Sequence, residues 1–284
     1  RLERIDAVFS NYVKENKLAG SVILVARKGK VGYFKSFGYR DIASKAAMTN
    51  DDIFRIASQT KAIISVGIMT LQEEGKLLIQ DNVSQYIPEF KETTVAVAKE
   101  SGGYEVVKAK RQITIRDLLT HTSGMGYGYG AASSEWKKAE IQGWYFADRN
   151  EPIAETIKRM AAVPMDAQPG TEWVYGYSID VLGAIIEKAS GMPLDQFLQD
   201  RIFNPLGMMD THFYLPKNKS ARLATVYSPK EGSPLMPAPI VGTMDSQGAY
   251  VDGPRKSFSG GAGLLSTATD YYLFLQMMAN KGEL

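Results

Sequence analysis

Ser58 and Lys61 stand three residues apart, directly before an apolar run, and could together form a nucleophile. Side chains with this spacing lie on one face of a helix, one turn apart. An amine beside a hydroxyl can activate that hydroxyl for attack on a carbonyl carbon without any histidine. The amine must be neutral to accept the serine proton. Burial in the helix expected over Lys61 to Leu71 could lower a lysine pKa by about three units, or about 4 kcal/mol.

The same two residues also have a structural interpretation, in which Ser58 caps the helix and Lys61 is a solvated residue of its first turn. A second Ser-x-x-Lys, from Ser134 to Lys137, lies in a polar segment between loops, and we interpret it as chance. Lys61 differs because it enters an apolar helix. The start of that helix would favour an oxyanion, and we predict the Ser58 backbone N–H as an oxyanion-hole donor.

Serine chemistry that depends on histidine finds little support. A Ser-His-Asp site would need His121 or His212, the only histidines, as its base. We expect His121 to be a hydrogen-bonded turn residue instead. The nucleophile elbow Gly-x-Ser-x-Gly does not occur, because the nearest match, Gly176 to Asp180, lacks its second glycine.

Composition excludes several other classes of function. The 284 residues include 33 basic and 31 acidic ones, giving a net charge of +2, and no basic run suggests nucleic-acid or membrane-surface binding. With no cysteine and two histidines, disulfides, thiol catalysis and zinc sites built on those residues are excluded. We expect no metal, no cofactor and no nucleic acid, only a small-molecule ester substrate.

No apolar run reaches the roughly 18–20 residues needed to span a membrane. The chain starts at Arg1, so an export signal would not be visible. We favour a soluble protein of the periplasm or the exterior over a cytoplasmic one.

The pattern of apolar residues predicts an α/β architecture. Helical spacing over Leu2 to Glu15 precedes two β-rich runs, 21–26 and 31–37, joined by a glycine-containing turn. We expect this first helix to pack on the resulting hairpin. We read residues 91–110 as a loop or weak hairpin and 216–257 as a loop-rich excursion. Further helices are expected at 113–119, 153–161, two segments on either side of Gly191, and 267–279.

The loop from Met125 to Gly130 alternates glycine with tyrosine. Glycine leaves the backbone free, while tyrosine offers a large amphipathic ring. The loop is either an ordinary surface loop with packed rings or a wall that contacts substrate. Tyr127, Tyr129 and the later Tyr177 are the candidates for such a wall.

Several blocks together resemble the serine β-lactamase-like superfamily, which includes class C β-lactamases, D-amino peptidases and family VIII carboxylesterases. The similarity runs from about Val8 to the last residue and looks closest to the esterase branch. The matching blocks are Ser58 to Lys61, Leu118 to Gly124, Gln168 to Gly170 leading into Trp173 to Tyr175, Asp180 to Gly183, Asn204 to Thr211, and Gly260 to Asp270.

The resemblance implies a fold and three catalytic roles. The fold would be of the β-lactamase/D-amino-peptidase transpeptidase type, an antiparallel sheet flanked by helices with a large, mainly helical insertion. We expect an α/β domain over 1–60 and 258–284 and a helical domain over 61–257. Ser58 would be the acylated nucleophile, and Lys61 and Tyr175 would share the acid and base work. Tyr175 is chosen over Tyr177 because it stands eight residues before Gly183; which of the pair takes the serine proton stays open.

The chain departs from the family pattern in two places. Class C β-lactamases carry Tyr-x-Asn where this chain has Tyr175 and Tyr177, which argues against strong β-lactamase activity. The third family motif lies on a strand after the last helix, and we expect it in a segment of roughly 80–120 residues beyond Leu284.

The sequence therefore predicts a serine carboxylesterase that cleaves small acyl esters through an acyl-enzyme. A β-lactamase, D-amino peptidase or acyltransferase with the same three residues is the alternative among enzymes. A catalytically silent penicillin-binding-like sensor domain is the alternative from another class.

Overall fold

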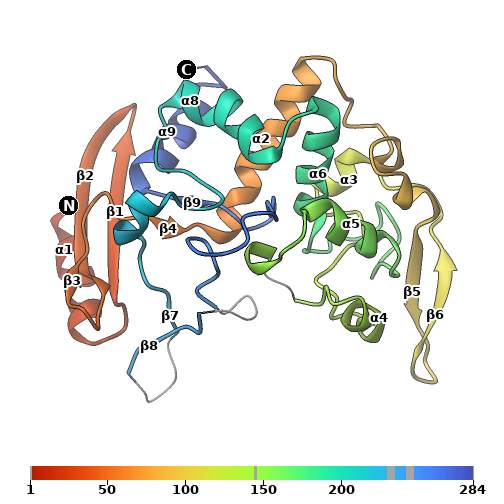
Figure 1. The fold of residues 1–284 in the computed structure, drawn as a ribbon, viewed down its shortest axis with the longest axis horizontal. Helices are drawn as coiled ribbons and strands as arrows, with labels where there is room; N and C mark the ends of the chain where they lie inside the picture. Colours follow the sequence, from red (N-terminus) through yellow and green to blue (C-terminus); the bar gives the residue numbers. More distant parts are fainter. Residues whose placement is uncertain (1, 144–145, 229–233, 241–245, 284) are drawn as a thin grey trace. The chain divides into compact units, whose positions relative to one another are not determined.

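The computed structural model describes residues 2–143, 146–228, 234–240 and 246–283. The contacts group the chain into two compact units. Figure 1 colours the ribbon by residue number, so the segments of each unit can be followed. The first unit combines Arg1–Ile56, Ile202–Asp252 and Leu264–Leu284, and the second combines Ala57–Arg201 and Gly253–Gly263. Each unit is described separately below.

An antiparallel hairpin forms the sheet of the first unit, as predicted. Strand β1 (Gly20–Arg27) pairs with β2 (Lys30–Asp41), and the short β3 (Ala46–Ala47) pairs with the end of β2. The connecting turn places Lys28 at φ 52° and Gly29 at φ 71°. Two left-handed residues form the tight turn whose twist matches that of the paired strands.

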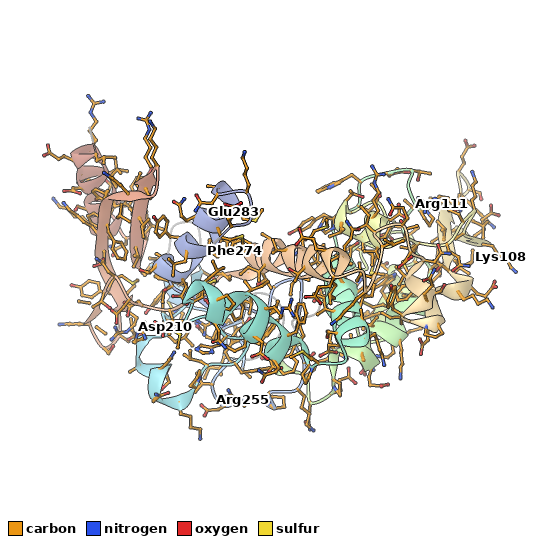
Figure 2. All side chains as sticks on the ribbon, turned by 90° about the horizontal axis from the view of Figure 1, so that it is seen from above. Lys108, Arg111, Asp210, Arg255, Phe274 and Glu283 are labelled. Atoms are coloured by element: carbon orange, nitrogen blue, oxygen red, sulfur yellow. The ribbon has the colours of Figure 1, made fainter. Side chains whose placement is uncertain are left out.

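Two helices pack on this hairpin. Helix α1 (Glu3–Lys14) contacts β2, with Phe9 stacked on Phe37 at 5.9 Å between ring centroids. Helix α9 (Ala268–Ala279) contacts β1 and buries Phe274, which is labelled in Figure 2. Figure 1 shows the two helices on opposite sides of the hairpin. Both helices and their positions against the sheet confirm the expected flanked antiparallel sheet.

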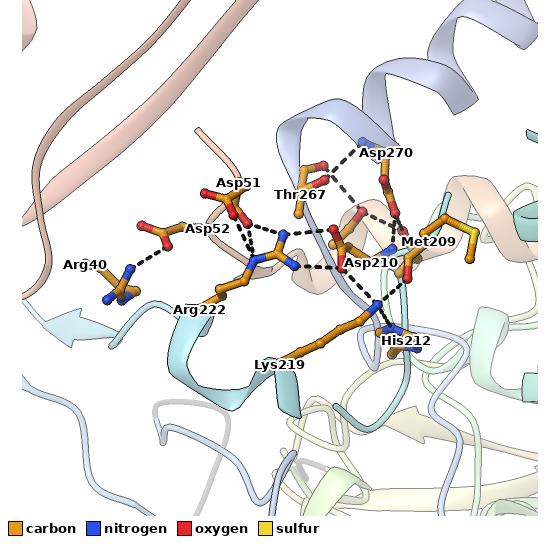
Figure 3. A network of polar contacts seen from close by, with 12 residues as sticks. Arg40, Asp51, Asp52, Met209, Asp210, His212, Lys219, Arg222, Thr267 and Asp270 are labelled. Atoms are coloured by element: carbon orange, nitrogen blue, oxygen red, sulfur yellow. Dashed lines mark hydrogen bonds and ion pairs between the residues drawn. The ribbon is translucent and has the colours of Figure 1, made fainter. Parts of the chain in front are cut away.

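The excursion after the helical region belongs to the first unit by its contacts, whereas we had assigned it to the helical domain. Arg222 pairs with Asp210 at 2.8 Å and with Asp51 at 3.2 Å, and Lys219 pairs with Asp210 at 2.9 Å (Figure 3). The pair with Asp51 joins the excursion to the segment just before strand β4 (Phe54–Arg55), and the two pairs with Asp210 join it to the segment after helix α8 (Asn204–Leu206). We therefore propose a division in which 202–252 is part of the α/β unit.

Short strands complete the first unit. The described part of the excursion is mostly irregular, as expected, and contains one small strand pair. That pair joins β7 (Tyr227–Ser228) with β8 (Met236–Pro237). A second short pair, outside the excursion, joins β4 (Phe54–Arg55) with β9 (Leu265–Ser266).

Helices α2 (Thr60–Glu73) and α6 (Ser178–Ser190) form the centre of the second unit. The α2 side chains Ile63, Ile64 and Ile68 are fully buried. Burying each of them stabilises the fold by roughly 1.5–3 kcal/mol. This burial explains why the chain forms a helix immediately after Ser58 despite three β-branched isoleucines.

Three further helices of the second unit lie close to the predicted positions, at 115–119, 153–161 and 194–198. Helix α5 has the predicted bounds, and the stretch predicted as a loop or weak hairpin contains the pair β5–β6. The remaining elements are α3 (Ile115–Leu119), α4 (Ser133–Lys138), α5 (Ile153–Ala161), α7 (Leu194–Leu198), α8 (Asn204–Leu206), β5 (Thr94–Ala98) and β6 (Tyr104–Lys108). Among the residues that the structure describes, no helix has the length and apolar character to cross a membrane.

Candidate functional site

The nucleophile candidate sits at the entry to helix α2. Ser58 lies in a short 3-10 turn, Ala57–Gln59, and is exposed, while Lys61 on the first turn of α2 is only 9% exposed. Lys61 Nζ donates to Ser58 Oγ at 3.2 Å. No side-chain bond caps α2, so the capping interpretation of Ser58 is wrong. The spacing of three residues brings hydroxyl and amine together as the helical period predicts.

The residue before Ser58 has an unusual backbone. Ala57 adopts φ 44°, in the left-handed region that costs a residue with a side chain roughly 1–2 kcal/mol. Strain of this kind persists where the surrounding structure imposes it, often at functional sites. The predicted oxyanion role of the Ser58 backbone N–H fits this position at a helix entry but remains a prediction.

The second Ser-x-x-Lys has different surroundings. Its segment, predicted only as a polar stretch between loops, forms the short helix α4, and Trp136 between the two motif residues is fully buried. Ser134 and Lys137 are both exposed. Nothing desolvates this lysine, so the interpretation of the second motif as chance is retained.

Tyr175 reaches Lys61 from a segment that pairs with the turn after α3. The backbone N–H of Val174 donates to the carbonyl of His121 at 2.8 Å, and Gly170 N–H donates to Thr122 at 2.7 Å. These bonds set Tyr175 so that Lys61 Nζ lies 4.7 Å from its ring centroid. The structure therefore brings Ser58, Lys61 and Tyr175 together.

Electrostatics at the Tyr175 phenol favour its ionised form. Burial raises the pKa of Tyr175, but hydrogen bonds with Ser58 and Lys61 and the positive charge of Lys61 outweigh burial, and the net pKa is lowered. A hydrogen bond with Tyr127 lowers it further. The same hydrogen bond contributes to a raised Tyr127 pKa, after burial as the main cause, so Tyr127 is the donor.

The three wall candidates have three different positions. Tyr127 packs edge-on against Tyr175 at 5.8 Å and contacts the phenol directly. Tyr177 is only 2% exposed and lies against Tyr127 and Trp136, so we now expect it to pack behind the wall and not to contact substrate. Its ring is needed to fill the core behind the wall. Tyr129 is largely exposed, and its role in substrate binding stays a prediction.

His121 is a turn residue, as predicted, and its ring also contacts the site. Its backbone has φ 56°, donates to Leu118 and accepts from Val174. The imidazole lies 4.8 Å from the Tyr175 ring centroid. Burial and the Lys61 charge lower the pKa of His121 to about 4, so the ring is neutral near pH 7. Its buried Nδ1 has no hydrogen-bond partner within the described residues.

The turn that carries His121 is held by a capped helix. Thr114 and Asp117 form a reciprocal capping box at the start of α3. Arg111, labelled in Figure 2, donates two hydrogen bonds to the Asp117 carboxylate, at 2.6 and 2.8 Å. Such two-pronged pairs add geometric precision as well as energy. They orient the turn against which the Tyr175 segment is paired.

A buried carboxylate, Asp180, is a site residue that we did not predict. It is 2% exposed and accepts from Ser259 Oγ at 2.6 Å and from the Gly261 backbone N–H at 3.0 Å. The Gly261 carbonyl in turn accepts from Lys61 Nζ at 2.7 Å. Burial raises the Asp180 pKa, opposed by these hydrogen bonds and by the charge of Lys61. Asp180 thus fixes residues 259–261, called the strap below, and the strap in turn accepts the hydrogen bond from Lys61.

Glycine allows this strap to approach helix α6. A Cβ at Gly260 would lie 2.6 Å from the Ile179 carbonyl oxygen and 3.4 Å from the Cα of Gly183. Only residues without a side chain permit this distance. Gly260 and Gly261 lie in one of the family blocks and Gly183 ends another, and packing next to Lys61 requires glycine at 260 and 261.

The described residues offer no group of three His, Asp or Glu side chains that could hold a metal ion. The chemistry that the site can perform follows from its own groups. These are a hydroxyl, a buried lysine side chain and a tyrosine whose pKa is lowered.

Comparisons with known proteins agree with this fold. The chain is 35% identical to Protein Rv1367c of Mycobacterium tuberculosis over 270 residues, covering 93% of this chain and 63% of that protein. It is 33% identical to Esterase EstB of Burkholderia gladioli, covering 99% of this chain and 71% of EstB. A solved structure, "EstCE1, a hydrolase with promiscuous acyltransferase activity", superposes with a TM-score of 0.81 at 28% identity, covering 99% of this chain and 73% of EstCE1.

The profile of the Beta-lactamase family matches residues 5–284, nearly the whole chain. The similar structures have the β-lactamase and penicillin-binding-protein fold, in agreement with the flanked antiparallel sheet and the helical unit. Together with the identity to EstB, this match shows that the chain belongs to the β-lactamase family.

Proposed function

We propose that the protein hydrolyses small carboxylic esters through an acyl-enzyme formed on Ser58. The observation that carries this proposal is the hydrogen-bonded cluster of Ser58, Lys61 and Tyr175. A relative named as an esterase and a similar structure described as a hydrolase support the ester as the substrate class. The cluster contains every group that acyl transfer needs for attack and proton exchange.

The proposed reaction has two steps, acylation of Ser58 and hydrolysis of the acyl-enzyme. In the first, Ser58 Oγ bonds to the acyl carbon and gives its proton to Tyr175, and the bond from that carbon to the alcohol oxygen breaks. The alcohol leaves with the proton returned by Tyr175. In the second step, water attacks the acyl carbon and loses a proton to Tyr175. The bond to Ser58 breaks, and Ser58 recovers the proton as the carboxylic acid leaves.

We assign the base role to Tyr175 and a cationic role to Lys61. An ammonium has three N–H donors, and Lys61 Nζ faces the Gly261 carbonyl, Ser58 Oγ and the Tyr175 phenol. Three acceptors suit a charged donor and leave no lone pair to take a proton. Hydrogen bonding with Ser58 is among the causes that lower the Tyr175 pKa, and we therefore assign the phenol oxygen as the acceptor of the serine proton.

Acyl transfer to an alcohol other than water is the second candidate. The description of EstCE1 as a hydrolase with promiscuous acyltransferase activity favours it. β-Lactam hydrolysis is less favoured, because Tyr177 is buried and offers no amide to a β-lactam side chain at the position where class C enzymes have asparagine.

The proposal is tested with p-nitrophenyl acetate and butyrate beside the β-lactam nitrocefin. Wild-type protein is expected to prefer the esters and to form a covalent fluorophosphonate adduct that mass spectrometry places on Ser58. Ser58→Ala should lose both turnover and adduct, whereas Ser134→Ala, in the second motif, should keep both. Ester turnover that survives in Ser58→Ala would refute the assigned nucleophile. Faster turnover of nitrocefin would favour a β-lactamase, and absence of any adduct a silent sensor.

Tyr127→Phe is expected to move the pH dependence of ester hydrolysis. Removing the donor destabilises the Tyr175 phenolate, so the Tyr175 pKa rises. If the phenolate is the base, the rising limb of kcat/KM shifts upward by about one to two pH units, the equivalent of a hydrogen bond to a charged group. Tyr104→Phe, in the β5–β6 hairpin, is the control. An unshifted limb in Tyr127→Phe would argue against Tyr175 as the base.

A further inference from the structure

Trp173 presents most of its indole to solvent beside the catalytic cluster. Its side chain is 68% exposed, in contrast to Trp136, which is fully buried. An aromatic side chain that stays in water does not gain the stabilisation that comes from burying its surface of about 150–250 Å². Exposed apolar surface next to a reactive centre commonly marks a place where a ligand binds.

The indole is held in one orientation before any substrate arrives. It stacks on the Tyr175 ring at 5.7 Å between centroids with 25° between the planes. The His121 ring meets it edge-on at 6.2 Å. The hydrogen bond from the Val174 N–H to the His121 carbonyl fixes the backbone between Trp173 and Tyr175. A ligand that stacks on Trp173 would therefore meet a preorganised surface, which reduces the entropy lost on binding.

We infer that Trp173 binds the alcohol part of the ester and favours flat, apolar rings there. This inference rests on the proposed function. Tyr175 returns its proton to the leaving alcohol oxygen, so that oxygen must come within hydrogen-bonding distance of the phenol. The carbon groups attached to it then extend over the most exposed of the rings around Tyr175, which is Trp173. The acyl group, bonded to Ser58, extends from the other side of the carbonyl carbon.

The same surface has a consequence for acyl transfer. An acceptor alcohol attacks the acyl-enzyme by the reverse of the step in which the first alcohol left, so it occupies the same subsite. Alcohols with a flat ring should therefore compete with water better than aliphatic alcohols of similar size.

The test compares esters that share an acetyl group and differ in the alcohol. 2-Naphthylmethyl acetate has a flat ring, and cyclohexylmethyl acetate is its matched partner, since both release a primary alcohol. Trp173→Ala is expected to lower the ratio of their kcat/KM values about tenfold, the effect of one aromatic contact. Trp173→Phe should restore most of the ratio. The change should appear in kcat/KM, which reports acylation, more than in kcat for a shared acetyl-enzyme.

Controls separate this inference from the proposed function. Leu78→Ala removes an exposed apolar side chain of the same unit and should leave the ratio unchanged. A series of ethyl esters with different acyl groups should be affected equally by Trp173→Ala. An unchanged alcohol ratio, or a loss that follows the acyl series, overturns the alcohol subsite but not the nucleophile. Ester turnover that persists in Ser58→Ala overturns the proposed function, and the subsite with it.

Discussion

Lys61→Met is expected to lower kcat/KM for p-nitrophenyl acetate by about 10²–10⁴-fold, the range for a group that takes part in proton transfer. Methionine has a similar length but no charge and no N–H. The variant removes the donor to Ser58 Oγ and the charge that lowers the Tyr175 pKa. Both losses act on the same proton transfer, so the effect should be larger in kcat than in KM.

Two variants make this prediction specific to the Lys61 ammonium. Lys61→Arg keeps the charge, but a planar guanidinium cannot reach three acceptors from a side chain that is 9% exposed, so little activity should return. Lys137→Met makes the same substitution in the second Ser-x-x-Lys and should leave activity and thermal unfolding as in wild type. If Lys61→Met remains folded and retains activity within a few fold, the role of Lys61 proposed above is wrong.

Asp180→Asn should both destabilise the protein and slow ester hydrolysis. Both bonds end on the same carboxylate oxygen, Oδ1. The amide keeps one oxygen for them, but it loses the negative charge that strengthens them and brings a buried NH₂ group that needs an acceptor of its own. An unmatched buried polar group costs about 1–3 kcal/mol of unfolding free energy. The freed strap would move the Gly261 carbonyl away from Lys61, and a displacement near 1 Å can cost about 10²-fold in rate.

A control separates positioning by Asp180 from general destabilisation. Ser259→Ala removes the hydrogen bond to Asp180 and the long one from the Ala262 N–H, and it leaves the carboxylate and the Gly261 contact in place. It should reduce the unfolding free energy by about 1 kcal/mol, measured by urea unfolding, with a small effect on kcat. If Asp180→Asn and Ser259→Ala lower kcat equally at matched stability, the strap does not position Lys61.

Asp180 illustrates what could be read from the chain and what could not. Its block, Asp180 to Gly183, was part of the family resemblance, and the apolar pattern predicted a helix that ends at Gly191. Its partner Gly261 lies 81 residues away, and the bond from Gly261 to Lys61 spans 200 residues. No local periodicity encodes contacts at such separations, so the function of the carboxylate could not be predicted.

The sequence by itself determined the features that depend on local repetition. The helical period placed Ser58 and Lys61 on one face, alternation and a glycine turn produced the β1–β2 hairpin, and α5 has the predicted bounds. These features form because backbone geometry repeats every 2 or 3.6 residues and selects the side chains that face the core.

Only the tertiary structure decided which aromatic residues serve the site. Tyr127, Tyr129 and Tyr177 looked equivalent, yet one contacts Tyr175, one is exposed and one fills the core. The ion pair between Arg222 of the excursion and Asp51, just before β4, likewise could not be predicted from the pattern. The physical reason is the same in each case. Long-range packing and ion pairs depend on where distant segments meet, and the conformational preference of each segment alone does not contain that information.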